Sequence, residues 1–285
     1  MIAAPAFSRF NFQYDNWGAD PSNFPGTAVS AGLSNAEGAW TQIASGANIA
    51  QDVYALMLFL SGGRIVGADP SMLLDIGVDP AGGTSYTPVI SDIVCGGSAY
   101  PLNTVGGITF SLPLFIRAGS SVAVREQSSH TSSVGARVAA RFYGAPSRPE
   151  LTRAAQYAET IGTITGSQGV SFTPGNQLDG AWTLLGTTTR ALWWWQTALQ
   201  VSNSTIGDQY VYAEIARGDA SNKQSIMRVM ASMSASEDLG TTMSDNCNPF
   251  AAYCPVPAGT NIYIRGRCSG APASGYNAVA IGLGG

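Results

Sequence analysis

A chain of 285 residues is long enough for two domains that each bury a core without help from metals or disulfides. Its 34 Gly and 15 Pro, with only 11% charged residues, argue against exposed helices and predict an all-β protein. A formal net charge of −4 comes without clustered Lys and Arg, which excludes DNA or RNA as an expected partner.

The first 28 residues mix Pro, Asn and Gly with aromatic side chains. This segment is too apolar for a solvated tail and too broken for a regular element. It has neither the basic region nor the apolar run of a secretory signal, and no segment of the chain approaches the length of a membrane span. We therefore expect an N-terminal arm over residues 1–28 that docks on a neighbouring surface, with an extra edge strand as the alternative. The docking side chains would be Phe7, Phe10, Phe12, Tyr14 and Trp17.

Alternation of apolar and polar residues, interrupted by Gly, Pro and Asn, predicts seven strands in each half of the chain. In the first half they fall near residues 40–43, 53–60, 73–78, 88–94, 109–116, 121–125 and 136–143. In the second half they fall near 182–185, 191–201, 209–216, 225–233, 250–256, 261–265 and 276–283. The segment 225–233 also fits a helix by its spacing, but its repeat partner favours a strand. Seven or eight short strands per half are typical of a jelly-roll-like β-sandwich.

Two motifs occur once in each half, at nearly the same separation. GAWT occupies residues 38–41 and 180–183, and Ala-Gly-Ser or Ala-Gly-Thr followed by a strand occurs around Gly119 and Gly259. Two motifs repeated in the same order indicate a duplicated unit. We predict two tandem β-sandwich domains of the same fold, at residues 29–148 and 161–285. Residues 149–160 between them have helical spacing and are expected to form a linker.

The Ala-Gly-Ser and Ala-Gly-Thr motifs have a structural interpretation. Gly119 and Gly259 supply the unrestricted backbone of a tight turn, and the branched residues that follow point into the core. Arg125 and Arg265 are then expected at the ends of these strands.

Three consecutive tryptophans lie in the predicted strand 191–201. On a strand, Trp193 and Trp195 share one face while Trp194 takes the other, so both faces must be covered. The core covers one face. The sister domain, another subunit or a stacked sugar would cover the second, and protein packing is the favoured interpretation. Tyr210 and Tyr212 would complete a glycan-stacking platform in the sugar alternative.

Catalytic and metal-binding patterns are missing from the sequence. His130 is the single histidine and lies in a polar loop, and the four cysteines lack zinc-ligand spacing. Carboxylate pairs such as Asp75 with Asp79, or Glu214 with Asp219, fall at strand ends and turns, where Asp usually bonds to backbone. We expect no enzyme activity, no cofactor and no metal. Cys254 and Cys268 would form a disulfide if their strands were neighbours in an oxidising environment; buried free thiols are the favoured alternative.

The segments LPLFIRAGSSVAVREQ (112–127) and PVPAGTNIYIRGR (255–267) resemble a motif of β-sandwich structural proteins in tailed bacteriophages, with Arg117 standing where the motif has proline. The resemblance implies a non-enzymatic virion component, such as a capsid decoration, head fibre or tail-tip subunit, made and assembled in the bacterial host cytoplasm. Its implied partners are copies of itself, with a trimer favoured, and other virion proteins. A carbohydrate- or host-receptor-binding module that uses Trp193, Trp194 and Trp195 is the alternative, and a glycan-degrading enzyme ranks third.

Overall fold

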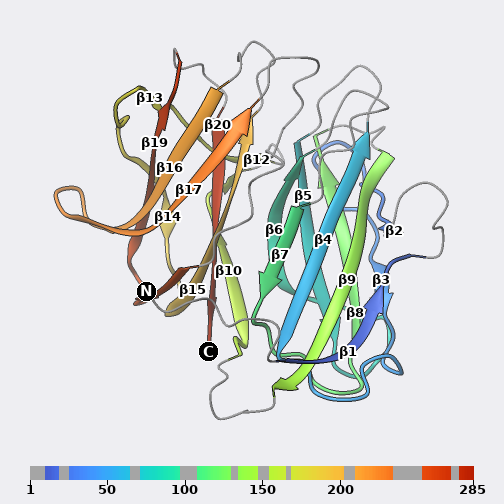
Figure 1. Ribbon diagram of the computed structural model, residues 1–285. Helices are drawn as coiled ribbons and strands as arrows, with labels where there is room; N and C mark the ends of the chain where they lie inside the picture. The colour runs from blue at the N-terminus through green and yellow to red at the C-terminus, as the bar shows by residue number, and fades with distance from the viewer. Residues whose placement is uncertain are drawn as a thin grey trace.

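A computed structural model describes residues 10–18, 26–64, 71–96, 108–129, 134–146, 154–164, 168–201, 209–233, 252–270 and 276–285. All regular structure in these residues is β, arranged in four sheets that form two sandwiches side by side (Figure 1). Helices long and apolar enough to cross a membrane are absent from the same residues. The predicted all-β class is therefore confirmed.

Domain 1 consists of sheets A and B. Sheet A has the order β1-β9-β4-β7, with β2 also on β9, and sheet B has the order β3-β8-β5-β6. The strands of sheet A are β1 (Phe10–Asn16), β2 (Thr27–Ala28), β4 (Ala55–Arg64), β7 (Ile108–Leu112) and β9 (Val134–Pro146). Those of sheet B are β3 (Thr41–Ala44), β5 (Ser71–Asp79), β6 (Thr87–Gly96) and β8 (Ser121–Ser128).

Domain 2 consists of two sheets that we call A′ and B′. Sheet A′ has the order β11-β12-β20-β15-β18, with β10 also on β20, and sheet B′ has the order β13-β19-β16-β17, with β14 also on β19. The strands of sheet A′ are β10 (Tyr157–Ile161), β11 (Thr163–Ile164), β12 (Gln168–Phe172), β15 (Leu192–Val201), β18 (Ala252–Val256) and β20 (Tyr276–Gly284). Those of sheet B′ are β13 (Gly175–Asn176), β14 (Thr183–Thr187), β16 (Gln209–Gly218), β17 (Lys223–Met233) and β19 (Asn261–Cys268).

The strand order confirms the duplication predicted from the repeated motifs. The path β9-β4-β7 in sheet A corresponds to β20-β15-β18 in sheet A′, and β3-β8-β5-β6 corresponds to β14-β19-β16-β17. The segment with ambiguous spacing, 225–233, lies in strand β17, because its alternate residues Met227 and Val229 face the core. Every motif of the first half therefore has a structural counterpart in the second.

Two segments predicted to lie outside the sandwiches are strands within them. Residues 10–16 form β1, which pairs antiparallel with β9 and places Tyr14 opposite Phe142. The edge-strand alternative thus replaces the docked arm over these residues, and Phe7 lies outside the described part of the chain. Residues 157–160, predicted as the end of the linker, form β10 on β20 together with residue 161. Both strands use backbone groups that a central strand offers on its free side, which side-chain spacing does not reveal.

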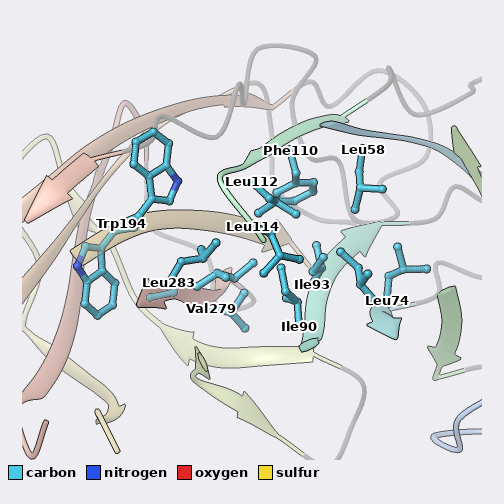
Figure 2. Packing of buried hydrophobic residues seen from close by; sticks show 14 of the residues in the cluster. Leu58, Leu74, Ile90, Ile93, Phe110, Leu112, Leu114, Trp194, Val279 and Leu283 are labelled. Atoms are coloured by element: carbon cyan, nitrogen blue, oxygen red, sulfur yellow. The ribbon is translucent and has the colours of Figure 1, made fainter. Parts of the chain in front are cut away.

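The outer face of sheet A′ covers the open side of domain 1 between β6 and β7. Strand β6 contacts β10, β15 and β20, and all nine residues of β20 are buried. Figure 2 shows Val279 and Leu283 of β20 beside Ile90 and Leu114 of domain 1. One hydrophobic cluster contains residues of both domains. The two sandwiches therefore share a continuous core.

Polar contacts also fix the position of domain 2 on domain 1. The hydroxyl of Thr160 donates to the carbonyl oxygen of Ser91. Nε2 of Gln196 donates to the carbonyl oxygen of Ser111 at 2.8 Å. Both donors are satisfied by backbone carbonyls, whereas the buried Oε1 of Gln196 has no hydrogen-bond partner among the described residues.

Candidate functional site

Each copy of GAWT places its tryptophan beneath an arginine from a neighbouring strand. The guanidinium carbon of Arg125 lies 4.5 Å from the ring centre of Trp40, and that of Arg265 lies 4.4 Å from the ring centre of Trp182. This is cation–π geometry. The recurrence of the motif is therefore explained by a cluster that both domains have kept.

In domain 1 this cluster is closed. Nη2 and Nε of Arg125 each lie 2.8 Å from Oδ2 of Asp75, and Nη1 lies 2.5 Å from Oε2 of Glu37. The side chain of Asp75 is only 7% exposed, and its Oδ1 accepts the backbone N–H of Asp92 at 2.8 Å. Gly77 leaves room for the tryptophan, because a Cβ there would lie 2.7 Å from Cη2 of Trp40. The arrangement is typical of a structural ion pair.

In domain 2 the corresponding cluster is larger. Arg265 donates to Oε2 of Glu214 at 2.6 and 2.8 Å, and Asp179, just before the second GAWT, lies 3.1 Å from the same guanidinium. Arg228 donates to Oε1 of Glu214 from Nε and Nη2 at 3.2 and 3.0 Å, and Arg267 donates to Oδ1 of Asp179 from Nε and Nη2 at 3.1 and 2.7 Å. The cluster thus joins three arginines to two carboxylates on the solvent face of sheet B′.

The arginines determine the protonation of both carboxyl groups. Burial alone would raise the pKa of Glu214, but hydrogen bonds from Arg265, Ser225 and Arg228 hold it below its usual value. A hydrogen bond from Arg267 lowers the pKa of Asp179. Both groups are therefore ionised acceptors at neutral pH.

This cluster lines a hollow of about 200 Å³ together with Tyr212, Ala213 and Gly266. Tyr210 and Tyr212 stand two residues apart on β16 and share its outer face, where they are 59% and 53% exposed. The Arg228 side chain is 72% exposed. Exposed aromatic faces beside charged donors and acceptors can stack on and hydrogen-bond a polar ligand. Of the predicted glycan-stacking platform, Tyr210 and Tyr212 are therefore the residues that are exposed to solvent.

The tryptophan triplet is buried, so its prediction as a glycan platform is wrong. Trp193, Trp194 and Trp195 are 5%, 3% and 0% exposed. Nε1 of Trp195 donates to the carbonyl oxygen of Cys254 at 2.9 Å. Trp194 pairs with Leu283 across β15 and β20, which places it on the face of sheet A′ that is turned toward domain 1. The interpretation that the sister domain covers the second face is the one realised, and the triplet lies on a different sheet from Tyr210 and Tyr212.

The outer face of sheet A carries an aromatic group that we call the sheet A patch: Phe12, Trp17, Met57 and Phe59. Phe12 and Trp17 are 57% and 41% exposed, and the rings of Trp17 and Phe59 lie 5.3 Å apart. Arg141 lies over both exposed rings, at 5.8 and 5.5 Å. Tyr14 turns the other way and packs on Phe142 in the core. Sequence reasoning found the aromatic residues of β1 but missed Met57, Phe59 and Arg141, which alternation on β4 and β9 could have assigned to the same outer face.

The two glycine turns form as predicted, but the arginines that follow them do not end their strands. Gly119 and Gly259 have φ of 80° and 76°, and their N–H groups each donate to a backbone carbonyl at 2.7 Å. Arg125 lies inside β8 and Arg265 inside β19, three residues before each strand ends. The carboxylates on β5 and β16 hold the arginines in mid-sheet, so these strands continue past them.

The remaining predicted residues have structural roles. Cys254 lies on β18 of sheet A′ and Cys268 on β19 of sheet B′, and both thiols are free, as the favoured alternative had it; the possible disulfide between them is not formed. Asp79 and Asp219 accept backbone N–H groups in turns, and these hydrogen bonds lower the pKa of each carboxyl group. Among the residues described, no three His, Cys, Asp or Glu side chains are grouped as metal ligands would be.

Comparisons with known proteins return structural matches only. No protein-family model matches the chain, and no curated protein sequence matches it. PNGF-II is 9% identical with a TM-score of 0.42 over 97% of this chain and 66% of its own, so this chain spans just under two thirds of that protein. PNGase F, a glycosylasparaginase from Flavobacterium meningosepticum, is 12% identical with a TM-score of 0.39 over 95% of this chain and 96% of its own. The STIV MCP is 9% identical with a TM-score of 0.37 over 95% and 96%. Because these TM-scores are low, the assignment of fold depends on the strand order itself.

Proposed function

We propose that this protein is a non-enzymatic structural subunit of a bacteriophage virion that assembles with copies of itself and with other virion proteins. The sheet A patch is the observation that carries the proposal. Its counterpart in domain 2, the outer face of sheet A′, contacts the sister domain through β10, β15 and β20, and β20 is buried along its whole length. A patch of exposed aromatic side chains on a surface whose duplicate is an interface favours assembly.

Other features support the same role. The segments 112–127 and 255–267 resemble a motif of phage β-sandwich proteins, and each forms a glycine turn leading into β8 or β19. The shared core makes the two sandwiches one rigid building block rather than two hinged modules. Such a block suits a capsid decoration, a head fibre or a tail subunit.

Quantitative mass spectrometry of purified particles tests the virion role. Particles banded on a density gradient, from cells that express the chain from its native gene, should contain it in several copies per particle. The control is a soluble host protein of similar abundance, which should be depleted from the band. A chain found only in the soluble fraction would contradict the proposal.

Carbohydrate or receptor binding at the hollow of sheet B′ is the second candidate function. Exposed Tyr210 and Tyr212 beside the exposed guanidinium of Arg228 favour it, and they suit an anionic sugar best. Trp182 stacks on Arg265, which lines this hollow, and provides a fluorescent reporter.

A glycan titration tests this candidate. An acidic oligosaccharide should quench tryptophan fluorescence of the wild-type chain, and Tyr212→Ala should weaken binding at least tenfold with an unchanged melting temperature. Tyr253→Ala, an exposed tyrosine on the other sheet, is the matched control and should bind as wild type. Equal loss in both variants, or no quenching by any sugar tried, would remove this candidate.

A further inference from the structure

The contact between the two domains has a face and an edge. The face is the outer side of sheet A′, formed by β10, β15 and β20. The edge is the open side of domain 1 between β6 and β7, where Ile90, Ile93 and Leu114 meet Val279 and Leu283 (Figure 2). Because the domains are duplicates, each of these two surfaces occurs twice in the chain.

One face and one edge are left over after this contact. The outer side of sheet A is the unused face, because β4 and β9 take the places of β15 and β20. The side of domain 2 between β17 and β18 is the unused edge, because these strands take the places of β6 and β7. In the described residues β17 pairs only with β16, and β18 only with β15.

Both unused surfaces expose apolar side chains. The face carries the sheet A patch, with Phe12 at 57% exposure. The edge carries Tyr253 at 47% exposure, with its ring 6.0 Å from Trp193 and with Ile226 half-buried beside the core. Domain 1 buries side chains of this kind at its own edge under sheet A′.

The unused face is also continuous with the established contact. Tyr54 and Met57 pack on the small cluster of Ala55 and Tyr143 on sheet A. The ring of Tyr54 lies 5.6 Å from Phe115, which is 37% exposed and donates its backbone N–H to Ala155 at the domain junction. A second sandwich packed on this face would therefore extend the existing core.

We propose that the sheet A face of one copy docks on the β17–β18 edge of a second copy and reproduces the contact between the two domains. This inference rests on the proposed assembly function and names its partner as the same chain. The contact is heterologous, because the two surfaces differ, so its repetition gives a closed ring or an open chain. In such an assembly the contact between two chains has the same geometry as the contact between the two domains of one chain. Each sandwich that is not at an end of the assembly therefore packs on one neighbour through its face and on another through its edge.

Charge substitutions on the two surfaces test the proposal by complementation. Phe12→Glu disables the face and Tyr253→Glu disables the edge, and both side chains are exposed, so folding should be retained. Light scattering should show an oligomer for wild type and a monomer of 29.5 kDa for each variant alone. An equimolar mixture should give a species of twice the protomer mass, because the intact face of one variant still fits the intact edge of the other.

Several results would overturn the inference. A mixture that stays monomeric would contradict it, as would Tyr253→Glu remaining oligomeric, since that indicates a contact of two sheet A faces. Met57→Glu, a second face variant, must behave like Phe12→Glu, and circular dichroism melting must show that each variant is folded. A wild-type chain that is monomeric at high concentration but present in purified particles would refute this contact while leaving the virion role standing.

Discussion

The two sandwiches share one strand order but differ in what covers their outer faces. In sheet A′ the nine residues of β20 are all buried, and all of them except Asn277 are apolar, aromatic or glycine. Sheet A has the same place in domain 1, yet its β4 alternates between buried Leu56 and Leu58 and half-exposed Met57 and Phe59. The difference shows that the environment of a sheet, rather than its topology, determines the pattern of its strands.

The polar clusters differ in a similar way. Two residues before Asp75 lies Leu73, which is 2% exposed, whereas Tyr212 lies two residues before Glu214 and is 53% exposed. Domain 2 also has Arg267 where domain 1 has Gln127, two residues after the central arginine. Both copies therefore contain the arginine, the tryptophan and their carboxylates. Only in domain 2 is this cluster exposed to solvent. Four sets of variants test whether the two sandwiches differ in this way.

Asp75→Asn should have the largest effect, about 4 kcal/mol of lost unfolding free energy, because it removes the buried carboxylate beside Arg125 and leaves only Glu37, whose side chain is 48% exposed. The measurement is urea unfolding followed by circular dichroism. Glu214→Gln is the matched change in domain 2 and should cost about 2 kcal/mol, because Arg265 keeps Asp179 and is more solvated. Equal costs would mean that the two clusters are equally closed.

Leu283→Ala should cost about 3 kcal/mol, because the side chain is fully buried between sheet A′ and domain 1. Met57→Ala on the corresponding face of sheet A should cost under about 1 kcal/mol in the monomer, because its side chain is only partly buried. Thermal melting at low protein concentration measures both. A large cost for Met57→Ala in a monomer would show that the sheet A patch is part of a core.

Gly119→Ala and Gly259→Ala should each cost about 1 kcal/mol, because both glycines have positive φ. No atom lies within 4 Å of a Cβ built on either residue, so backbone strain is the only penalty. Equal losses in urea unfolding are expected at the two equivalent turns. A difference of more than about twofold would indicate that the turns are packed differently.

Asp92→Asn should have the smallest effect, a gain in melting temperature of about 2 °C at neutral pH. Burial, then repulsion from Asp75, raises the pKa of Asp92 above its ordinary 3.8, while the Thr163 hydroxyl of domain 2 donates to it at 3.1 Å. The folded state therefore holds this proton more tightly than the unfolded state, and stability is lost as pH rises from the unfolded toward the folded pKa. Asparagine tolerates the φ of 60° at this position.

The control for Asp92→Asn is Asp219→Asn, which should shift stability in the opposite direction. Backbone hydrogen bonds from Asn222 and Ser221 lower the pKa of Asp219, so its ionised form stabilises the fold above the unfolded pKa. Melting curves recorded from acid to neutral pH should converge for wild type and Asp92→Asn at the acid end. A gap that persists there would assign the effect to packing instead of charge.

The sequence pattern was sufficient to predict most strands and the duplication of the sandwich, because the alternation of apolar residues and the turn glycines are local signals. It failed for β10, whose partner β20 lies more than a hundred residues away and offers only backbone groups. For the second face of the tryptophan strand it favoured protein packing but left the sister domain, another subunit and a sugar open, because no pattern within domain 2 records that domain 1 covers sheet A′. Arg125 was placed at a strand end for the same reason, since its carboxylate partners come from distant segments.

Thr160 and Gln196 donate to the main-chain carbonyl oxygens of Ser91 and Ser111. These hydrogen bonds therefore depend on where the backbone lies and are independent of the serine side chains. Substitutions at those two serines leave the acceptors in place. A gene that has doubled can therefore vary at these two positions without losing the alignment of its halves. Such tolerance accounts for sister units that keep one architecture while sharing little more than two short motifs.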